Sequence, residues 1–395
     1  MKIDNLLGVC EMKTKWVICA ITVILSLQII NSNSGAAVNT SSIDNVRNKP
    51  VLNDQDKQII DRFLEEQINE LSKTSTKNLT SSAQIRTLIL SKQGTEGLYG
   101  NWFSELAKKH IKAGLEKVQA ITPKERRDIV ITNFLILIDG LQDLQLTDLV
   151  IPRLQSENKV IRYWAVHCLT NPGITKQLDS SLDSNMELAQ NITKHLKELL
   201  QTTSSPEILI QIARFAADMN IPEAVELLIQ TADSRIERYA DWTVKQELYD
   251  IFILKALDSK LQAAGAAGSS PTTGKAAIGR CFAQLYSYAI QRYVKGFNIL
   301  NDTQKKNLIS IMIEIEEKCI GRMLGRSQSA IRRAIERKSI PSLIEEHDKL
   351  LGSETTAGQL PTALGFNYGT MDDGTTRNAP LTLPDPPQKI TPEQG

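Results

Sequence analysis

Past residue 37, the sequence has few of the residues and motifs that mark a site of chemistry. Its four histidines fall in no HExxH or paired-cysteine pattern, so no metal site is predicted. It has no Gly-x-Ser-x-Gly turn, and its carboxylates are scattered over helix surfaces. The stretch Gly268–Lys275 has five residues between its glycines, whereas a phosphate-binding P-loop has four. The sequence therefore predicts no catalytic residue and no cofactor.

Cysteine is also scarce. Three cysteines follow residue 37, namely Cys168, Cys281 and Cys319, and they are far apart in the sequence. Each lies in an apolar helical pattern, which favours buried thiols, with one disulfide bond as the alternative.

The chain lacks an excess of charge of either sign. Its formal net charge is +1 at pH 7. The first 37 residues contribute Lys2, Lys13 and Lys15 against Asp4 and Glu11, so the rest of the chain is close to neutral. No global electrostatic field then draws it to nucleic acid or to an anionic membrane.

A secretory signal peptide is predicted over residues 1–37. Lys13 and Lys15 precede an apolar run from Trp16 to Ile30, and the small residues of 34–37 follow. The run is shorter than the about 20 apolar residues that span a bilayer. We therefore expect an exported protein, periplasmic or secreted; the alternative is a membrane anchor formed by residues 16–30.

Amphipathic helices dominate residues 54–351. The clearest pair is Leu146–Asn171, two short helices joined by a polar turn at 156–158. The second helix has an apolar stripe that we expect to be buried: Val160, Ile161, Trp164, Ala165, Cys168 and Leu169. His167 lies at the margin of this stripe, where a polar residue at the edge of a groove is expected.

This pair resembles a HEAT repeat. The features that match are Pro152 in the first helix, the short polar turn, and the pattern Val160-x-Arg162-x-x-Ala165-Val166-x-x-Leu169 in the second. A helix pair of this size cannot bury its apolar face alone and needs copies on either side. The resemblance implies an all-α fold, a right-handed stack of antiparallel helix pairs that forms an α-solenoid.

The remaining boundaries follow from composition. Residues 38–53 are predicted to be a linker, and Arg235–Leu261 one long helix. The Ala, Gly and Ser content of residues 263–274 predicts a flexible loop within the helical domain. Residues 352–395 are rich in Gly, Pro and Thr and are predicted to be a disordered tail.

One cluster of basic residues is a candidate binding site. It consists of Lys318, Arg322, Arg326, Arg332, Arg333, Arg337 and Lys338, with Glu336 as the single acid between Lys318 and Lys338. Guanidinium groups bind carboxylate or phosphate in a bidentate geometry, so the cluster could dock an acidic partner, a lipid surface or an anionic glycan. The alternative is a solvated helix face.

We therefore expect an exported, non-enzymatic scaffold that binds a protein partner through the surface of a helical repeat. Export disfavours nucleic acid as a partner. Membrane contact is expected only with an uncleaved leader, and no small-molecule substrate is identified. The alternative from another class is an extracytoplasmic lyase or hydrolase that acts on a cell-surface polymer and is built on an α/α helical scaffold.

Overall fold

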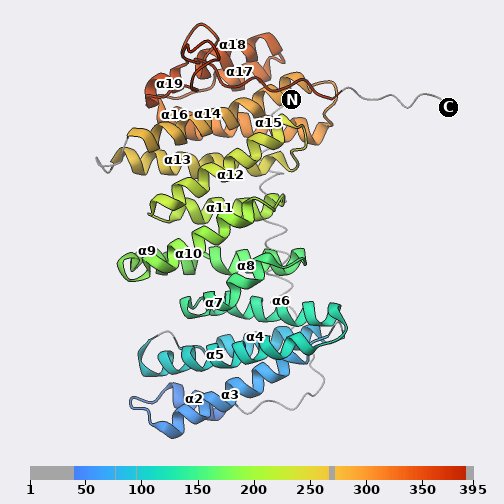
Figure 1. The fold of residues 1–395 in the computed structure, drawn as a ribbon, viewed down its shortest axis with the longest axis vertical. Helices are drawn as coiled ribbons and strands as arrows, with labels where there is room; N and C mark the ends of the chain where they lie inside the picture. Colours follow the sequence, from blue (N-terminus) through green and yellow to red (C-terminus); the bar gives the residue numbers. More distant parts are fainter. Residues whose placement is uncertain (1–39, 76, 95, 267–271, 388–395) are drawn as a thin grey trace, which may run out of the picture. The chain divides into compact units, whose positions relative to one another are not determined.

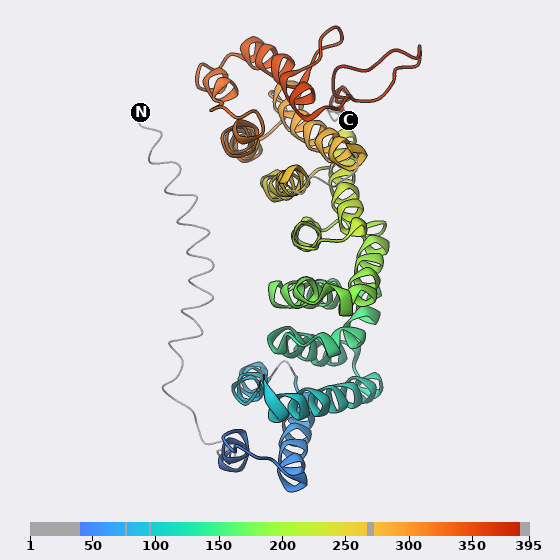
Figure 2. The same ribbon diagram turned by 90° about the vertical axis from the view of Figure 1, so that its left-hand side faces the viewer.

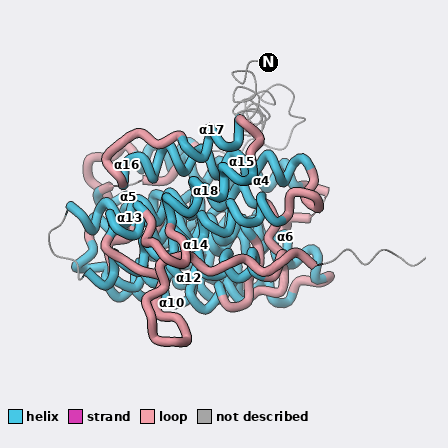
Figure 3. The backbone as a smooth tube through the Cα atoms, turned by 90° about the horizontal axis from the view of Figure 1, so that it is seen from above, coloured by secondary structure: helices cyan, strands magenta, loops and turns pink. Residues whose placement is uncertain are grey.

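The computed structural model describes residues 40–75, 77–94, 96–266 and 272–387, and over these residues the protein is all-α (Figure 1). Within these ranges strand pairing is limited to two isolated bridges, Gly352–Ala357 and Thr370–Thr376. Figure 3 accordingly shows only helix and loop in the described part of the chain. The predicted all-α class is confirmed. The predicted signal peptide and anchor, residues 1–37, lie outside the described residues.

The chain divides into two units, Met1–Ile60 and Asp61–Gly395. The first contains α2 (Ser41–Arg47) and the first turns of α3 (Asp54–Ser72). The Asn53 side chain accepts hydrogen bonds from the backbone N–H groups of Gln55 and Asp56 and so caps α3. Because α2 lies within residues 38–53, the prediction of a linker there is wrong for this stretch.

In the second unit, most helices pack in two rows, which Figure 2 shows side by side. Successive helices within a row contact each other, and the rows contact each other as well. The first row consists of α4 (Leu79–Ser91), α6 (Lys124–Leu141), α8 (Lys159–Thr170), α11 (Pro206–Asp218), α13 (Asp250–Ala266) and α15 (Asp302–Ile315). The second row consists of η3 (Ile151–Gln155), α10 (Leu182–Leu200), α12 (Pro222–Ala240) and α14 (Thr272–Lys295).

The remaining elements of this unit connect and flank the rows. Those before α10 are α5 (Gly97–Lys117), η1 (Val118–Ala120), η2 (Leu144–Leu146), α7 (Thr147–Val150) and α9 (Pro172–Ser180). Those after α12 are η4 (Glu247–Tyr249), the π-helical turn η5 (Glu316–Ile320), α16 (Gly321–Met323), α17 (Ala330–Glu336), α18 (Ile340–Leu351) and α19 (Gln359–Leu364). No helix among the described residues is long and apolar enough to cross a membrane.

The helix pair at 146–171 differs in detail from the prediction. The first helix is not continuous: α7 gives way to the 3-10 helix η3, in which Pro152 supplies no backbone donor. The second, α8, is capped by Asn158 as the polar turn suggests. Its buried side is rotated relative to the predicted stripe, because Val160 is 53% exposed and Trp164 is half-buried. The prediction that these two residues are core is therefore wrong.

Arg235–Leu261 is not one helix. α12 ends at Ala240 and α13 begins at Asp250, after a loop in which Trp242 and Gln246 have left-handed backbone angles, with φ of 59° and 53°. The loop brings Asp250 back to Arg235: Nε lies 2.6 Å from Oδ1, and Nη2 lies 3.1 Å from Oδ2. A buried ion pair thus joins α12 to the start of α13.

Further buried polar groups surround this pair. The Tyr239 hydroxyl donates to Asp250 Oδ2 at 2.7 Å, and Arg235 also donates to the Lys245 carbonyl at 3.1 Å. Arg292 on α14 lies 3.4 Å from Glu247 and 5.1 Å from the centre of the Trp242 ring. Two arginines and two carboxylates, each at most 3% exposed, therefore balance in charge at this junction.

The described residues of the predicted flexible loop at 263–274 are helical. α13 continues to Ala266, and α14 begins at Thr272. Residues 267–271 lie outside the described residues. The prediction is wrong for the described part of this stretch, because the alanines that suggested a linker also favour helix.

The predicted disordered tail is a packed segment over residues 352–387. It contains α19, and the Tyr368 hydroxyl donates to the Leu351 carbonyl at 2.9 Å. Leu360 and Leu383 are both 0% exposed. The prediction is therefore wrong for these residues, because contacts with distant helices order a segment whose own composition would not. Residues 388–395 lie outside the described residues.

Cys168, Cys281 and Cys319 are buried free thiols. Burial raises the pKa of Cys168 and Cys281 well above that of an ordinary thiol, and raises the pKa of Cys319 to about 12. The prediction of buried thiols is confirmed, and these side chains are protonated and unreactive at neutral pH.

Candidate functional site

The predicted basic cluster lies on η5, α16, α17 and the loops after them. Four of its side chains have partners in the protein. Arg332 pairs with Glu317 at 2.7 Å, and Arg322 pairs with Asp258. Arg326 donates to Gln359 at 2.7 Å, and Arg333 donates to Ser329 at 2.9 Å.

The other three members, Lys318, Arg337 and Lys338, are exposed. Four of the seven side chains are thus engaged with four different partners in the protein, Asp258, Glu317, Ser329 and Gln359. Binding of an acidic partner by this cluster stays a prediction.

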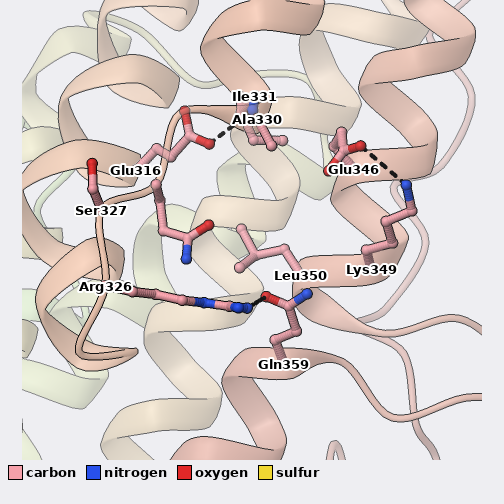
Figure 4. A pocket seen from close by; sticks show the side chains of 10 residues that line it. Glu316, Arg326, Ser327, Ala330, Ile331, Glu346, Lys349, Leu350 and Gln359 are labelled. Carbon is pink, nitrogen blue, oxygen red and sulfur yellow. Dashed lines mark hydrogen bonds and ion pairs between the residues drawn. The ribbon is translucent and has the colours of Figure 1, made fainter.

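A hollow of about 210 Å³ lies beside this region (Figure 4). The Glu316 carboxylate accepts hydrogen bonds from the backbone N–H groups of Ile331 and Arg332, at 2.8 and 2.9 Å. Burial raises the pKa of Glu316, although these donors oppose the shift. Lys349 is paired with Glu346 at 3.1 Å. The hollow is smaller than the about 300 Å³ typical of ligand pockets, and its buried carboxylate, Glu316, stabilises the start of α17.

A larger hollow, of about 520 Å³, lies between α14, α18 and residues 379–382. At its edge, Ser287 Oγ lies 2.8 Å from His347 Nε2, and His347 Nδ1 lies 2.8 Å from Asp348 Oδ1. This is the order of groups in a serine hydrolase. Ser287, however, is 0% exposed, and its Oγ also accepts a hydrogen bond from Gln291 at 2.8 Å. A nucleophile must reach its substrate, so this network gives no support to a hydrolase.

No group of three or more His, Cys, Asp or Glu side chains within the described ranges could hold a metal ion. The surface with the strongest signs of binding is formed by aromatic side chains on the first row. We call it the aromatic face and define it by six residues: Tyr163, Trp164, His167, Arg214, Tyr249 and Phe252.

Three rings of the aromatic face come from α8. The Tyr163 and Trp164 rings meet edge to face, with centres 5.8 Å apart, and the centre of the His167 ring lies 5.2 Å from that of Trp164. All three residues are half-buried. His167 Nδ1 lies 2.8 Å from Asp139 Oδ1 on α6, which fixes the orientation of the imidazole. The rings are therefore held in place while part of each meets solvent.

The next two helices of the row extend this face. On α11, the Arg214 guanidinium lies over the Phe252 ring of α13, 4.8 Å from its centre. Phe252 is 39% exposed. Burial raises the pKa of Tyr249, and the nearby Glu207 carboxylate and Tyr163 phenol raise it further. η4 also contacts α11, and α8, α11 and α13 contact one another in turn, so the face runs across three neighbouring helices.

Sequence reasoning missed this face. It assigned Trp164 to the core and passed over Tyr163, Arg214 and Phe252. The signal lay in the sequence Tyr163-Trp164-x-x-His167, where three rings occupy an arc of α8 that adjoins the buried stripe without coinciding with it.

Comparison with known proteins gave no further guidance. A scan against protein-family models, a search of curated proteins and a search of solved structures each found no match. The resemblance to a HEAT repeat therefore stays a prediction.

Proposed function

We propose that the protein is a non-enzymatic scaffold that binds a protein partner through the aromatic face. The observation that carries this proposal is the set of Tyr, Trp, Phe and Arg side chains that α8, η4, α13 and α11 hold half-exposed. These residue types are enriched in protein–protein interfaces and carry much of the binding energy there. Their neighbours already fix the rings, so little side-chain entropy is lost when a partner binds.

The arrangement of the helices fits this role. A helix in a row of contacting neighbours exposes one side, and the exposed sides of α8, α11 and α13 add up to a surface larger than any one of them offers. A HEAT-like solenoid is the repeat architecture that we propose for these rows.

The partner-binding proposal can be tested by truncating two rings of the aromatic face. We expect Trp164→Ala combined with Phe252→Ala to weaken capture of a bound protein, because truncating one central aromatic residue of an interface costs about 2 kcal/mol, or about thirtyfold in affinity. The measurement is quantitative mass spectrometry of proteins cross-linked to the full chain. Leu79→Ala is the control, since Leu79 on α4 is 52% exposed and lies outside the aromatic face.

The expected result is a set of proteins bound by the parent chain and by the Leu79→Ala variant, and lost from the double variant. The same set bound by all three chains would contradict the proposal. Melting curves of the three chains show whether the double variant is still folded when binding is lost.

We also propose that the scaffold works outside the cytoplasm, on the basis of the sequence pattern of residues 1–37. N-terminal sequencing of the exported protein is expected to begin near Ala37 or Val38, because the small residues before this point form the cleavage site. Recovery of the intact leader in the membrane fraction would instead support an anchor formed by residues 16–30.

A further inference from the structure

A second surface, apart from the aromatic face, already binds an extended peptide, and that peptide belongs to the chain itself. Residues 379–387 have no regular secondary structure and lie along α14. The Leu381 N–H donates to Gln284 Oε1 at 2.7 Å, and the Leu383 N–H donates to Gln291 Oε1 at 2.6 Å. The Leu381 carbonyl accepts from both glutamines, at 3.3 and 3.1 Å.

The two glutamines act on this segment as a neighbouring strand would. A side-chain amide offers one acceptor and two donors, like a short piece of backbone, so it can pair with both polar groups of an extended residue. Gln291 is held ready for this role, because its Nε2 also donates to Ser287 Oγ at 2.8 Å, and Ser287 in turn contacts His347. The buried Ser287–His347 network thus positions an amide that recognises peptide backbone.

Two more groups follow along the segment. Lys295 Nζ donates to the Leu383 carbonyl at 2.6 Å and pairs with Asp385 at 2.8 Å. The Trp242 indole N–H donates to the Pro384 carbonyl at 3.0 Å. The recognition is therefore directed mainly at the backbone, as in known sites for extended peptides.

Two residues of the segment, Pro380 and Leu383, are buried. Leu383 is 0% exposed and anchors it, whereas Leu381 is 45% exposed and the Asp385 side chain is 89% exposed. Prolines at 380, 384, 386 and 387 favour the extended conformation in the free chain. Little conformational entropy is therefore lost when the segment binds, and little is gained when it detaches. A segment that buries only two of its nine residues can detach without unfolding the helices beneath it.

The fit of the chain's own segment is incomplete. Thr382 lines the hollow of about 520 Å³ between α14 and α18, together with apolar side chains of Ile290, Val294 and Ile344. Thr382 itself is exposed. A segment with a large apolar side chain in place of Thr382 would fill this hollow and bury more apolar surface.

We propose that Trp242, Gln284, Gln291 and Lys295 form a binding site for an extended segment of a protein partner with the pattern Leu-Φ-Leu-Pro-Asp, where Φ is a large apolar residue. Residues 379–387 occupy this site in the absence of the partner and compete with it. The partner gains over the internal segment through the hollow beside Thr382. This site is independent of the aromatic face.

The test uses the full chain and two fluorescein-labelled peptides. One peptide has the sequence of residues 379–387, and the other has the same sequence with Thr382→Phe. Leu383→Asp in the full chain removes one of the two buried side chains of the internal segment and so weakens its binding, and Leu383→Ala is a milder second variant in case the charged one does not fold. Fluorescence anisotropy measures binding, and a melting curve establishes that each chain is folded.

We expect the native peptide to bind the Leu383 variants at least about tenfold more tightly than it binds the parent chain, because the internal competitor has been weakened. The Thr382→Phe peptide is expected to bind more tightly again, by about tenfold. Adding Gln291→Ala to a Leu383 variant is expected to weaken both peptides by about tenfold through the loss of two backbone hydrogen bonds. Gln190→Ala, a matched change on the exposed side of α10, is expected to change nothing.

Folded Leu383 variants that bind neither peptide would overturn the proposal. Binding that is indifferent to Gln291→Ala would also overturn it, since the peptide would then sit elsewhere. Trp164→Ala is expected to leave peptide binding unchanged, so this result and the test of the aromatic face can fail separately.

Discussion

Replacing Arg235 with methionine is expected to lower the free energy of unfolding by about 3 to 5 kcal/mol, the usual cost of removing one partner of a buried ion pair. Arg235 is 1% exposed and Asp250 is 0% exposed, so the carboxylate left behind has no access to water. Its remaining charged neighbour in this junction is Arg292, which is itself paired with Glu247. Denaturant-induced unfolding followed by circular dichroism measures the change.

A double variant separates the charge effect from the loss of packing. Arg235→Met with Asp250→Leu leaves neither charge unpaired, so it is expected to be more stable than the single variant. Lys255→Met is the surface control, because Lys255 and Glu314 form an ion pair whose side chains are 44% and 39% exposed. It is expected to cost less than about 1 kcal/mol. A single Arg235 variant as stable as the Lys255 control would show that the buried pair does not hold α12 to α13.

Replacing Phe215 with alanine is expected to cost about 3 to 5 kcal/mol, through lost burial and the cavity left behind. Phe215 is 0% exposed on the packed side of α11. The matched change is Phe252→Ala on α13, where the ring is 39% exposed and is expected to contribute less than about 1 kcal/mol. Thermal melts of the two variants compare a core ring with a ring of the aromatic face.

Equal losses of stability in the two variants would contradict the assignment of Phe252 to a binding surface. A large loss for Phe215→Ala together with a small one for Phe252→Ala would leave Phe252 available for a partner, as the proposed function requires.

The helices themselves could be predicted from the sequence because the signals that begin them are local. Asn301 and Gln304 form a capping box at the start of α15, and Pro206 and Pro222 occupy the first positions of α11 and α12. The regular spacing of apolar residues predicted that these helices are amphipathic and packed against neighbours. Each of these signals acts within a few residues of the chain, so its effect on structure can be read without knowledge of the fold.

The direction in which α8 faces could not be predicted in the same way. A helix with neighbours in its own row and in the next row buries a broad arc, and the apolar pattern does not locate the centre of such an arc. The centre of the buried arc of α8 lies nearer to Ala165 and Leu169, each 0% exposed, than to Trp164. Trp164, one of the six residues of the aromatic face, was therefore assigned to the core.

The packing of residues 379–387 could not be predicted from the sequence for a different reason. Its hydrogen-bond partners lie far back in the sequence. Gln284 precedes Leu381 by 97 residues, and Gln291 precedes Leu383 by 92 residues. Trp242 precedes Pro384 by 142 residues. Most of these contacts are made to backbone atoms, which every sequence has. The composition of the segment therefore does not indicate that contacts with its partners order it.

The same separation along the chain has a consequence for synthesis. Most helix contacts join elements close in sequence and can form soon after both elements leave the ribosome. Residues 379–387 emerge only after α14 is complete, so every newly made chain passes through a period in which Gln284 and Gln291 have no segment to bind. During that period the α14 surface is open to any extended chain nearby, and a partner made or present at that moment meets no internal competitor.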